Sequence, residues 1–248
     1  MRIIPGFLLF TLASAAITAE RIDSLPEVLA QHRQAMGEPL QSVQLELEIK
    51  EPAFNVAARY LANRDPAMRI DVYADGERVF SEGLNNDVAW QWPGDAVEPV
   101  PANADGAAAL LRGVYNNLYG LHERRALGYT LAYDGIESFD NKPYWKVTSI
   151  APDGFKEVYF INVKSGLIER KEEWAALHPD QDASKSWLVT NYYDYRWLGN
   201  RRLSFASDKR DGVSNEVLAE VKIRSVDLNP ALPRSVFQAR DKQNLPGH

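Results

Sequence analysis

The sequence predicts a mainly β fold of the α+β class, in which about eleven antiparallel strands follow one another as a meander. Apolar and polar residues alternate from Val43 to Ile49, which is typical of a strand with one buried face. Turn-forming residues, such as the Pro-Asp-Gly segment at 152–154, separate several apolar segments of the second half. One amphipathic helix interrupts the strands near mid-chain. These features predict a curved sheet with an apolar face, which can enclose a ligand.

Residues 1–19 have the pattern of a secretory signal peptide. Arg2 precedes an apolar segment that runs to Ile17, and small residues follow it. Cleavage is expected after Ala19 or, alternatively, after Ala15. An uncleaved anchor is disfavoured, because the segment falls short of the roughly 20 apolar residues that a spanning helix needs. The chain has no cysteine, and so neither a disulfide nor a lipid-attachment site. We therefore expect a soluble periplasmic protein.

The charge pattern excludes some classes of partner. The formal net charge is −6 over 248 residues, and loss of residues 1–19 changes it to −7 because only Arg2 is removed. Basic residues are scattered, so nucleic acid is not an expected partner. The four histidines lie far apart, which argues against a metal site. Motifs of the P-loop, G-x-G-x-x-G and G-x-S-x-G types are absent, so neither a cofactor nor catalysis is expected.

The mature chain is expected to form one domain over residues 20–240, with a flexible tail at 241–248. Ser24 and Glu27 predict a capping box at the start of the first helix, and Gly37 predicts its end. About five alternating strands follow before a proline-rich loop.

A second helix is predicted from Ala104 to Leu121. Its apolar residues recur at helical spacing and form one stripe. Gly113 lowers its stability by up to about 1 kcal/mol relative to alanine. A helix of low intrinsic stability that covers an apolar face would suit a lid. About six further strands, from residue 128 onward, complete the predicted sheet.

Several segments, taken in order, carry a resemblance to a known family. They are residues 28–49, 86–90, 159–162 with 165–170, 190 with 194–199, and 226–230 with Phe237. Together they resemble the outer-membrane lipoprotein-sorting proteins of the LolA/LolB-like periplasmic lipoprotein-carrier superfamily. The resemblance covers nearly the whole mature chain. It implies an incomplete antiparallel β-barrel, closed by helices around an apolar cavity. The chain departs from the group at Asn162, where an acid is usual, and at Arg202-Leu203, where Leu-Pro is frequent.

The expected ligand contacts are large apolar side chains of the strands and the lid helix, because such side chains offer wide contact area to acyl chains. They are Trp90, Trp92, Leu111, Val114, Leu118, Trp145 and Phe160. For the helix residues, ordinary core packing is the alternative interpretation.

Three functional hypotheses follow. The first is a non-enzymatic periplasmic carrier for a lipid-like ligand, such as the acyl chains of a lipoprotein. The second is an envelope sensor or scaffold that uses the same fold to bind a partner protein, including a membrane protein. The third is a hydrolase on a β scaffold, which would need converging polar groups in a cleft.

Overall fold

The computed structural model describes residues 24–239, so the expected signal peptide (1–19) and tail (241–248) lie outside the described residues. The described chain forms one sheet of thirteen strands in the order β6-β5-β4-β3-β2-β1-β13-β12-β11-β10-β9-β8-β7. All neighbouring strands are antiparallel, and the two outermost strands, β6 and β7, do not pair with each other. The sheet is therefore a barrel that does not close. This confirms the mainly β architecture with helices.

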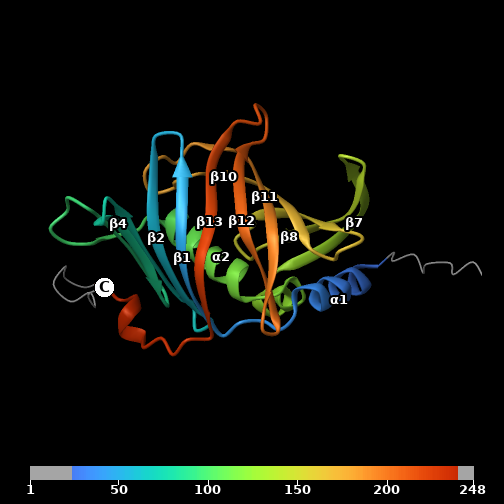
Figure 1. The fold of residues 1–248 in the computed structure, drawn as a ribbon, viewed down its shortest axis with the longest axis horizontal. Helices are drawn as coiled ribbons and strands as arrows, with labels where there is room; N and C mark the ends of the chain where they lie inside the picture. The colour runs from blue at the N-terminus through green and yellow to red at the C-terminus, as the bar shows by residue number, and fades with distance from the viewer. Residues whose placement is uncertain (1–23, 240–248) are drawn as a thin grey trace, which may run out of the picture.

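The elements follow the chain from an N-terminal helix to a short C-terminal one (Figure 1). The first half contains α1 (Leu25–Met36), β1 (Ser42–Glu51), β2 (Phe54–Asn63), β3 (Ala67–Ala74), β4 (Glu77–Asn85), β5 (Val88–Pro93), β6 (Val100–Pro101), α2 (Ala104–Leu118) and the 3₁₀ helix η1 (Leu121–Leu127). The second half contains β7 (Thr130–Phe139), β8 (Lys142–Ile150), β9 (Lys156–Asn162), β10 (Ile168–Ala176), β11 (Lys185–Leu198), β12 (Arg201–Asp211), β13 (Val217–Leu228) and the 3₁₀ helix η2 (Arg234–Phe237).

The pairing of β1 with β13 joins the two halves of the chain into one sheet. In β1, Val43 and Leu45 stand opposite Ala62 and Tyr60 of β2. Residues that face each other across antiparallel strands lie on the same side of the sheet. The alternation in β1 therefore builds one apolar inner face across both neighbours, as the sequence predicts.

The first helix begins and ends where the sequence predicts. The Glu27 carboxylate accepts hydrogen bonds from the backbone nitrogen and the hydroxyl of Ser24, at 3.1 and 2.7 Å. Gly37 has a φ of +75° at the end of α1, and a side chain there would collide with the carbonyl oxygen of Asn200. Glycine is thus required both by the backbone conformation and by the close approach of the β11–β12 turn.

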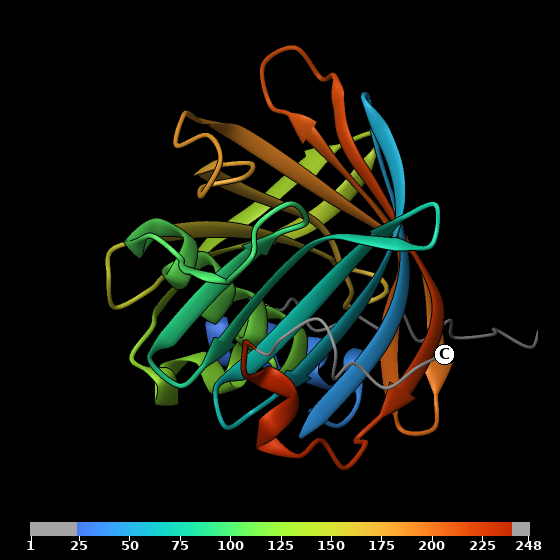
Figure 2. The same ribbon diagram turned by 90° about the vertical axis from the view of Figure 1, so that its left-hand side faces the viewer.

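The second helix lies in the hollow of the sheet, which curves around it (Figure 2). Asn103 caps α2 by accepting a hydrogen bond from Gly106 at 2.8 Å. The helix ends at Leu118, three residues before the predicted end, because Tyr119 has an extended backbone, and η1 continues the chain. The apolar stripe Leu110, Val114 and Leu118 is buried against β1–β5. The stripe therefore covers the inner face of β1–β5.

The sheet has two strands beyond the eleven or so that the sequence suggests. One is the two-residue β6, in the proline-rich loop. The other is β12, which pairs with both β11 and β13. Its inner positions include Arg201 and Lys209, so charged residues interrupt the apolar alternation that would reveal it.

Candidate functional site

A partly open cavity of about 290 Å³ lies in the hollow between the sheet and the helices. This volume is close to the lower end of the range for small-molecule sites, about 300–1,000 Å³. Its wall combines the end of α1, the C-terminal part of α2, η1 and the inner faces of β1, β2 and β9–β13. The lining side chains include His32, Met36, Leu40, Val43, Leu45, Leu47, Tyr60, Asn116, Asn117, Tyr119, Leu121, Arg124, Tyr159, Ile168, Tyr192, Tyr195, Arg201, Leu203, Phe205, Ser207, Val221 and Ile223.

One wall of the cavity is apolar and is formed where the two halves of the chain meet. Leu47 of β1 stands opposite Ile223 of β13, and both line the cavity. Leu203 and Phe205 continue the apolar wall on β12. Removal of apolar surface from water stabilises a complex by roughly 25 cal/mol per Å². This wall can therefore hold a hydrocarbon chain.

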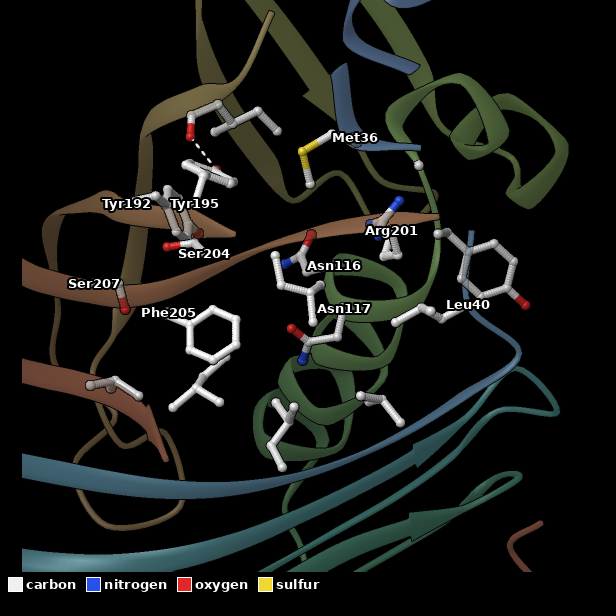
Figure 3. A pocket seen from close by; sticks show the side chains of 18 of the residues that line it. Met36, Leu40, Asn116, Asn117, Tyr192, Tyr195, Arg201, Ser204, Phe205 and Ser207 are labelled. Carbon is white, nitrogen blue, oxygen red and sulfur yellow. Dashed lines mark hydrogen bonds between the residues drawn. The ribbon is translucent and has the colours of Figure 1, made fainter. Parts of the chain in front are cut away.

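The opposite wall is the polar side of the end of α2. The Asn117 amide donates a hydrogen bond to the Tyr60 hydroxyl at 2.9 Å. Asn116 accepts one from the Tyr159 hydroxyl at 3.0 Å and donates one to Glu157 at 3.1 Å. Figure 3 shows both asparagines beside the same space as Arg201. Because each amide already has protein partners, the asparagines fix α2 to the strands.

A series of buried charges extends from Asn116 across β9–β12. Glu157 lies 3.8 Å from Arg124 and 3.1 Å from the Lys171 ammonium group, which also contacts Glu173 at 2.7 Å. Lys209 lies 4.0 Å from Glu173. Burial alone would raise the pKa of Glu157, but Lys171 and Arg124 hold it below its ordinary value. Burial would lower the pKa of Lys171, and the two carboxylates raise it well above its ordinary value. Glu157 and Lys171 are therefore both charged at neutral pH.

Arg201 differs from these residues because its charge has no close carboxylate. Its side chain lines the cavity at the start of β12 and is 4% exposed. Its Nη1 donates a hydrogen bond to the carbonyl oxygen of Glu38, at 3.4 Å, and its Nε has no partner among the described residues. Burial lowers its pKa, whereas the nearby Glu123 raises it. A guanidinium stays protonated in proteins, so the cavity contains a buried cation.

His32 is the neutral member of the wall. Its Nδ1 lies 2.9 Å from the carbonyl oxygen of Gly166, which can only accept, so Nδ1 carries the proton. Burial, opposed by the Gly166 bond and assisted by the charge of Arg201, lowers the pKa of His32 to about 4. His32 therefore adds no charge to the cavity at neutral pH.

Comparison with known proteins identifies the fold. No family model and no curated protein matches the chain. The chain is similar to the solved structure of a LolA superfamily protein from Nitrosomonas europaea, at 10% identity and a TM-score of 0.58, over 86% of this chain and 96% of the other. It is also similar to a domain from Vibrio parahaemolyticus described as an outer membrane lipoprotein-sorting protein domain, at 12% identity and a TM-score of 0.57, over 84% and 94%.

A DUF1329 family protein from Desulfovibrio piger matches at 10% identity and a TM-score of 0.60, over 86% of this chain and 95% of the other. The fold is LolA-like. At these identities the likeness concerns the fold alone. Among residues 24–239, the LolA-like chain has no helix that is both long and apolar enough to cross a membrane.

The residues predicted as ligand contacts lie around the LolA-like cavity without lining it. Val114 and Leu118 are fully buried between α2 and the strands, and Leu111 packs at the edge of the same cluster. Trp145 packs in a second cluster, with the first turns of α1. Their contact with a ligand stays a prediction, since it would require α2 or α1 to move.

The other three predicted residues pack elsewhere. The Trp90 indole donates a hydrogen bond to the carbonyl oxygen of Phe237 in η2, and the Trp92 indole donates one to Ala96. Phe160 meets Phe139 edge-to-face, and it follows Tyr159, which does line the cavity. Successive residues of a strand point to opposite faces. Phe160 therefore lies on the face away from the cavity.

Sequence reasoning did not find the polar residues of the wall. Asn116 and Asn117 stand next to the apolar stripe of α2, and two adjacent amides in a predicted lid are a signal of a second contact surface. Arg201 had no such signal. Its position depends on a backbone bridge to Gly37, which is distant in sequence.

Proposed function

We propose that this protein is a non-enzymatic periplasmic carrier, which binds a lipid-like ligand in the cavity between the sheet and α2. The observation that carries the proposal is the cavity of about 290 Å³ between the sheet and the helices, with one apolar wall. Apart from Arg201, the buried charges near it are paired with one another, and among residues 24–239 they do not place a nucleophile beside a base. This supports binding rather than catalysis.

The carrier would act by sequestration. Each buried methylene group of an acyl chain contributes about 0.8 kcal/mol, so a chain is favoured in the cavity over water. A volume of about 290 Å³ holds only a short part of a long chain. Displacement of α2 would open the apolar cluster between the helix and the strands, which contains Leu111, Val114 and Leu118 of α2 and Ala62, Met68 and Leu84 of the sheet. In that role α2 is a lid, and an acceptor that binds the chain more tightly would then receive it.

The fold and the N-terminal segment support an envelope location. Residues 1–19 have the pattern of a secretory signal, which would deliver the chain to the periplasm. The fold is shared with a domain described as an outer membrane lipoprotein-sorting protein domain. The acyl chains of a lipoprotein are therefore the first ligand to test.

Native mass spectrometry of the protein from a periplasmic fraction, followed by lipid extraction, tests the proposal. We expect an acyl-chain species bound at a defined stoichiometry. Ile223→Trp fills the cavity and should abolish retention, whereas Lys222→Trp, on the exposed side of the same strand, should not. An apo mass for the wild type, with no uptake of added phospholipid or lipoprotein, would contradict the carrier function.

One observation favours the second hypothesis, a partner-binding module. Trp174 of β10 and Trp187 of β11 stand directly opposite each other and are 64% and 42% exposed. Exposed tryptophans are enriched at protein interfaces. If Trp174→Ala with Trp187→Ala abolishes co-purification of an envelope protein while lipid retention persists, the module has a partner besides the ligand.

A further inference from the structure

We propose that the ligand of the cavity is an amphiphile with an anionic head group, a carboxylate or a phosphate, and that Arg201 recognises this head. The inference rests on the proposed function, because it assumes that the cavity takes an apolar chain. It goes further by assigning a chemical class to the head and a place to each end of the ligand.

The first argument is the uncompensated charge of Arg201. Burial of an ion costs several kcal/mol unless an opposite charge or hydrogen bonds replace its water. Arg124 lies 3.8 Å from Glu157, and Arg64 forms two bonds of 2.9 and 2.8 Å with Glu123. Arg201 is as buried as Arg124, yet the described residues place no carboxylate within 4.0 Å of it. A ligand anion would supply the missing charge.

The second argument is the supply of hydrogen-bond donors. The amides of Asn116 and Asn117 donate to Glu157 and Tyr60, and the Tyr195 hydroxyl donates to Ile168. Glu123, the acid whose charge raises the pKa of Arg201, is already held by Arg64 and by the backbone nitrogen of Gly120. The guanidinium of Arg201 has five N–H groups and one long hydrogen bond of 3.4 Å. Its remaining donors can form the paired bonds that a carboxylate or phosphate accepts.

The third argument is the order of residues along β12. Arg201, Leu203, Phe205 and Ser207 alternate along one strand, and all four line the cavity. Alternate residues of a strand share a face, so a cation stands at one end of an apolar track. The track spans about 20 Å at roughly 3.3 Å per residue. Leu47, Val221 and Ile223 widen it on the neighbouring strands. An anionic head at Arg201 and a chain along β12 would complement this order.

The test compares tetradecanoic acid with tetradecanol, which has the same chain and no charge, by competitive displacement of a fluorescent lipid at neutral pH. We expect the wild type to bind the acid about tenfold or more tightly than the alcohol. Arg201→Gln should lower the affinity for the acid to that for the alcohol and leave the alcohol unchanged. Arg201→Lys, which keeps the charge but not the paired geometry, should retain part of the preference.

Two further ligands distinguish a carboxylate head from a phosphate head. The results also show whether the assignment of Arg201 or the carrier function is wrong. A lysophospholipid with a phosphate head tests the phosphate, and inorganic phosphate without a chain should bind far more weakly than either lipid. Equal binding of acid and alcohol by the wild type overturns the assignment of Arg201 and leaves the carrier function standing. Failure of both to bind overturns the two proposals together.

The melting temperature of the delipidated protein tests the role of Arg201 without any added lipid. Because Arg201 is a buried cation without a partner carboxylate, Arg201→Met should raise the melting temperature of the delipidated protein. Arg124→Met, which leaves Glu157 with one cation fewer, should lower it. A fall in the melting temperature for Arg201→Met as large as that for Arg124→Met would mean that Arg201 is a structural residue, and would contradict the proposal.

Discussion

The two halves of the inner face are held by different kinds of interaction. On β1–β5 the helix α2 rests mainly on apolar side chains, in a cluster that contains Val43, Met68, Leu84 and Val114, and the bond from Asn117 to Tyr60 is a polar exception. On β9–β12 the inner face carries the series of buried ionisable side chains from Glu157 to Lys209. Apolar contacts are not directional and can be replaced by an acyl chain. A buried ion pair tolerates little displacement.

This difference suggests which part of the structure moves. The apolar half can exchange α2 for a ligand at little cost, whereas the charged half keeps its geometry and the Asn116 contacts that hold the end of α2. Further hydrogen bonds hold each end of the helix. At the N-terminal end the Asn103 backbone nitrogen donates one to Asp180, and at the C-terminal end Arg64 donates one to the Leu118 carbonyl oxygen. We expect α2 to pivot about its C-terminal end.

The largest effect should come from the charged half. Glu157→Gln leaves Arg124 and Lys171 buried beside a neutral side chain, and we expect a loss of about 4 kcal/mol in the free energy of unfolding. Denaturant titration checks this. Glu220→Gln is the control, because Glu220 forms an exposed pair with Lys50 and should contribute less than about 1 kcal/mol. An equal loss in the free energy of unfolding for the two substitutions would contradict the claim that buried charge pairs stabilise this half of the inner face.

Leu118→Ala tests the apolar half. Leu118 is the last residue of α2, and its side chain is fully buried. Its truncation should cost about 3 kcal/mol by loss of burial and by creation of a cavity. The same substitution should speed ligand exchange, because it weakens the seal. Stopped-flow displacement of a fluorescent lipid measures the rate. A loss of stability with an unchanged exchange rate would show that α2 does not act as a lid.

His32 should make the stability depend on pH. Its pKa is lowered to about 4 in the folded protein from an ordinary value of 6.5. The unfolded chain therefore binds the proton first as the pH falls, and the contribution of His32 is fully present above about pH 6.5 and is lost toward pH 4. We expect a loss of about 2 kcal/mol at about pH 5.

The control for this prediction is His32→Gln, whose amide can keep the hydrogen bond to Gly166. Glu82 acts in the opposite direction, because burial and the charge of Asp180 raise its pKa to about 7 and favour folding at lower pH. The difference between wild type and variant isolates His32. A constant difference from pH 7.5 to 5 would contradict the buried neutral imidazole.

The smallest effect concerns the intrinsic stability of α2. A Cβ at Gly113 would meet no atom within 4 Å, so Gly113→Ala should stabilise the helix by about 0.5–1 kcal/mol. Thermal unfolding checks the gain. If the helix is the lid, ligand exchange should slow by up to about fivefold, the rate equivalent of that energy. Destabilisation by the substitution would show that position 113 has a close contact.

The sequence was informative where structure is local. The alternation from Val43 to Ile49 and the end of α1 at Gly37 follow from backbone and burial rules, and the structure has both. The strand β12 was hidden because its inner face carries Arg201 and Lys209. Lys209 is stabilised there by Glu173 of a strand distant in sequence, a contact that local patterns do not reveal. Aromatic size likewise gave no indication of which face a tryptophan occupies.

The most direct test of the central claim is photo-crosslinking with a fatty acid that carries a diazirine in its chain, followed by peptide mapping. The account predicts labels on β12 (Arg201–Asp211) and β13 (Val217–Leu228), with loss of labelling in Ile223→Trp. Labels confined to the exposed pair Trp174 and Trp187, or labelling that Ile223→Trp leaves unchanged, would contradict a ligand site inside the half-barrel.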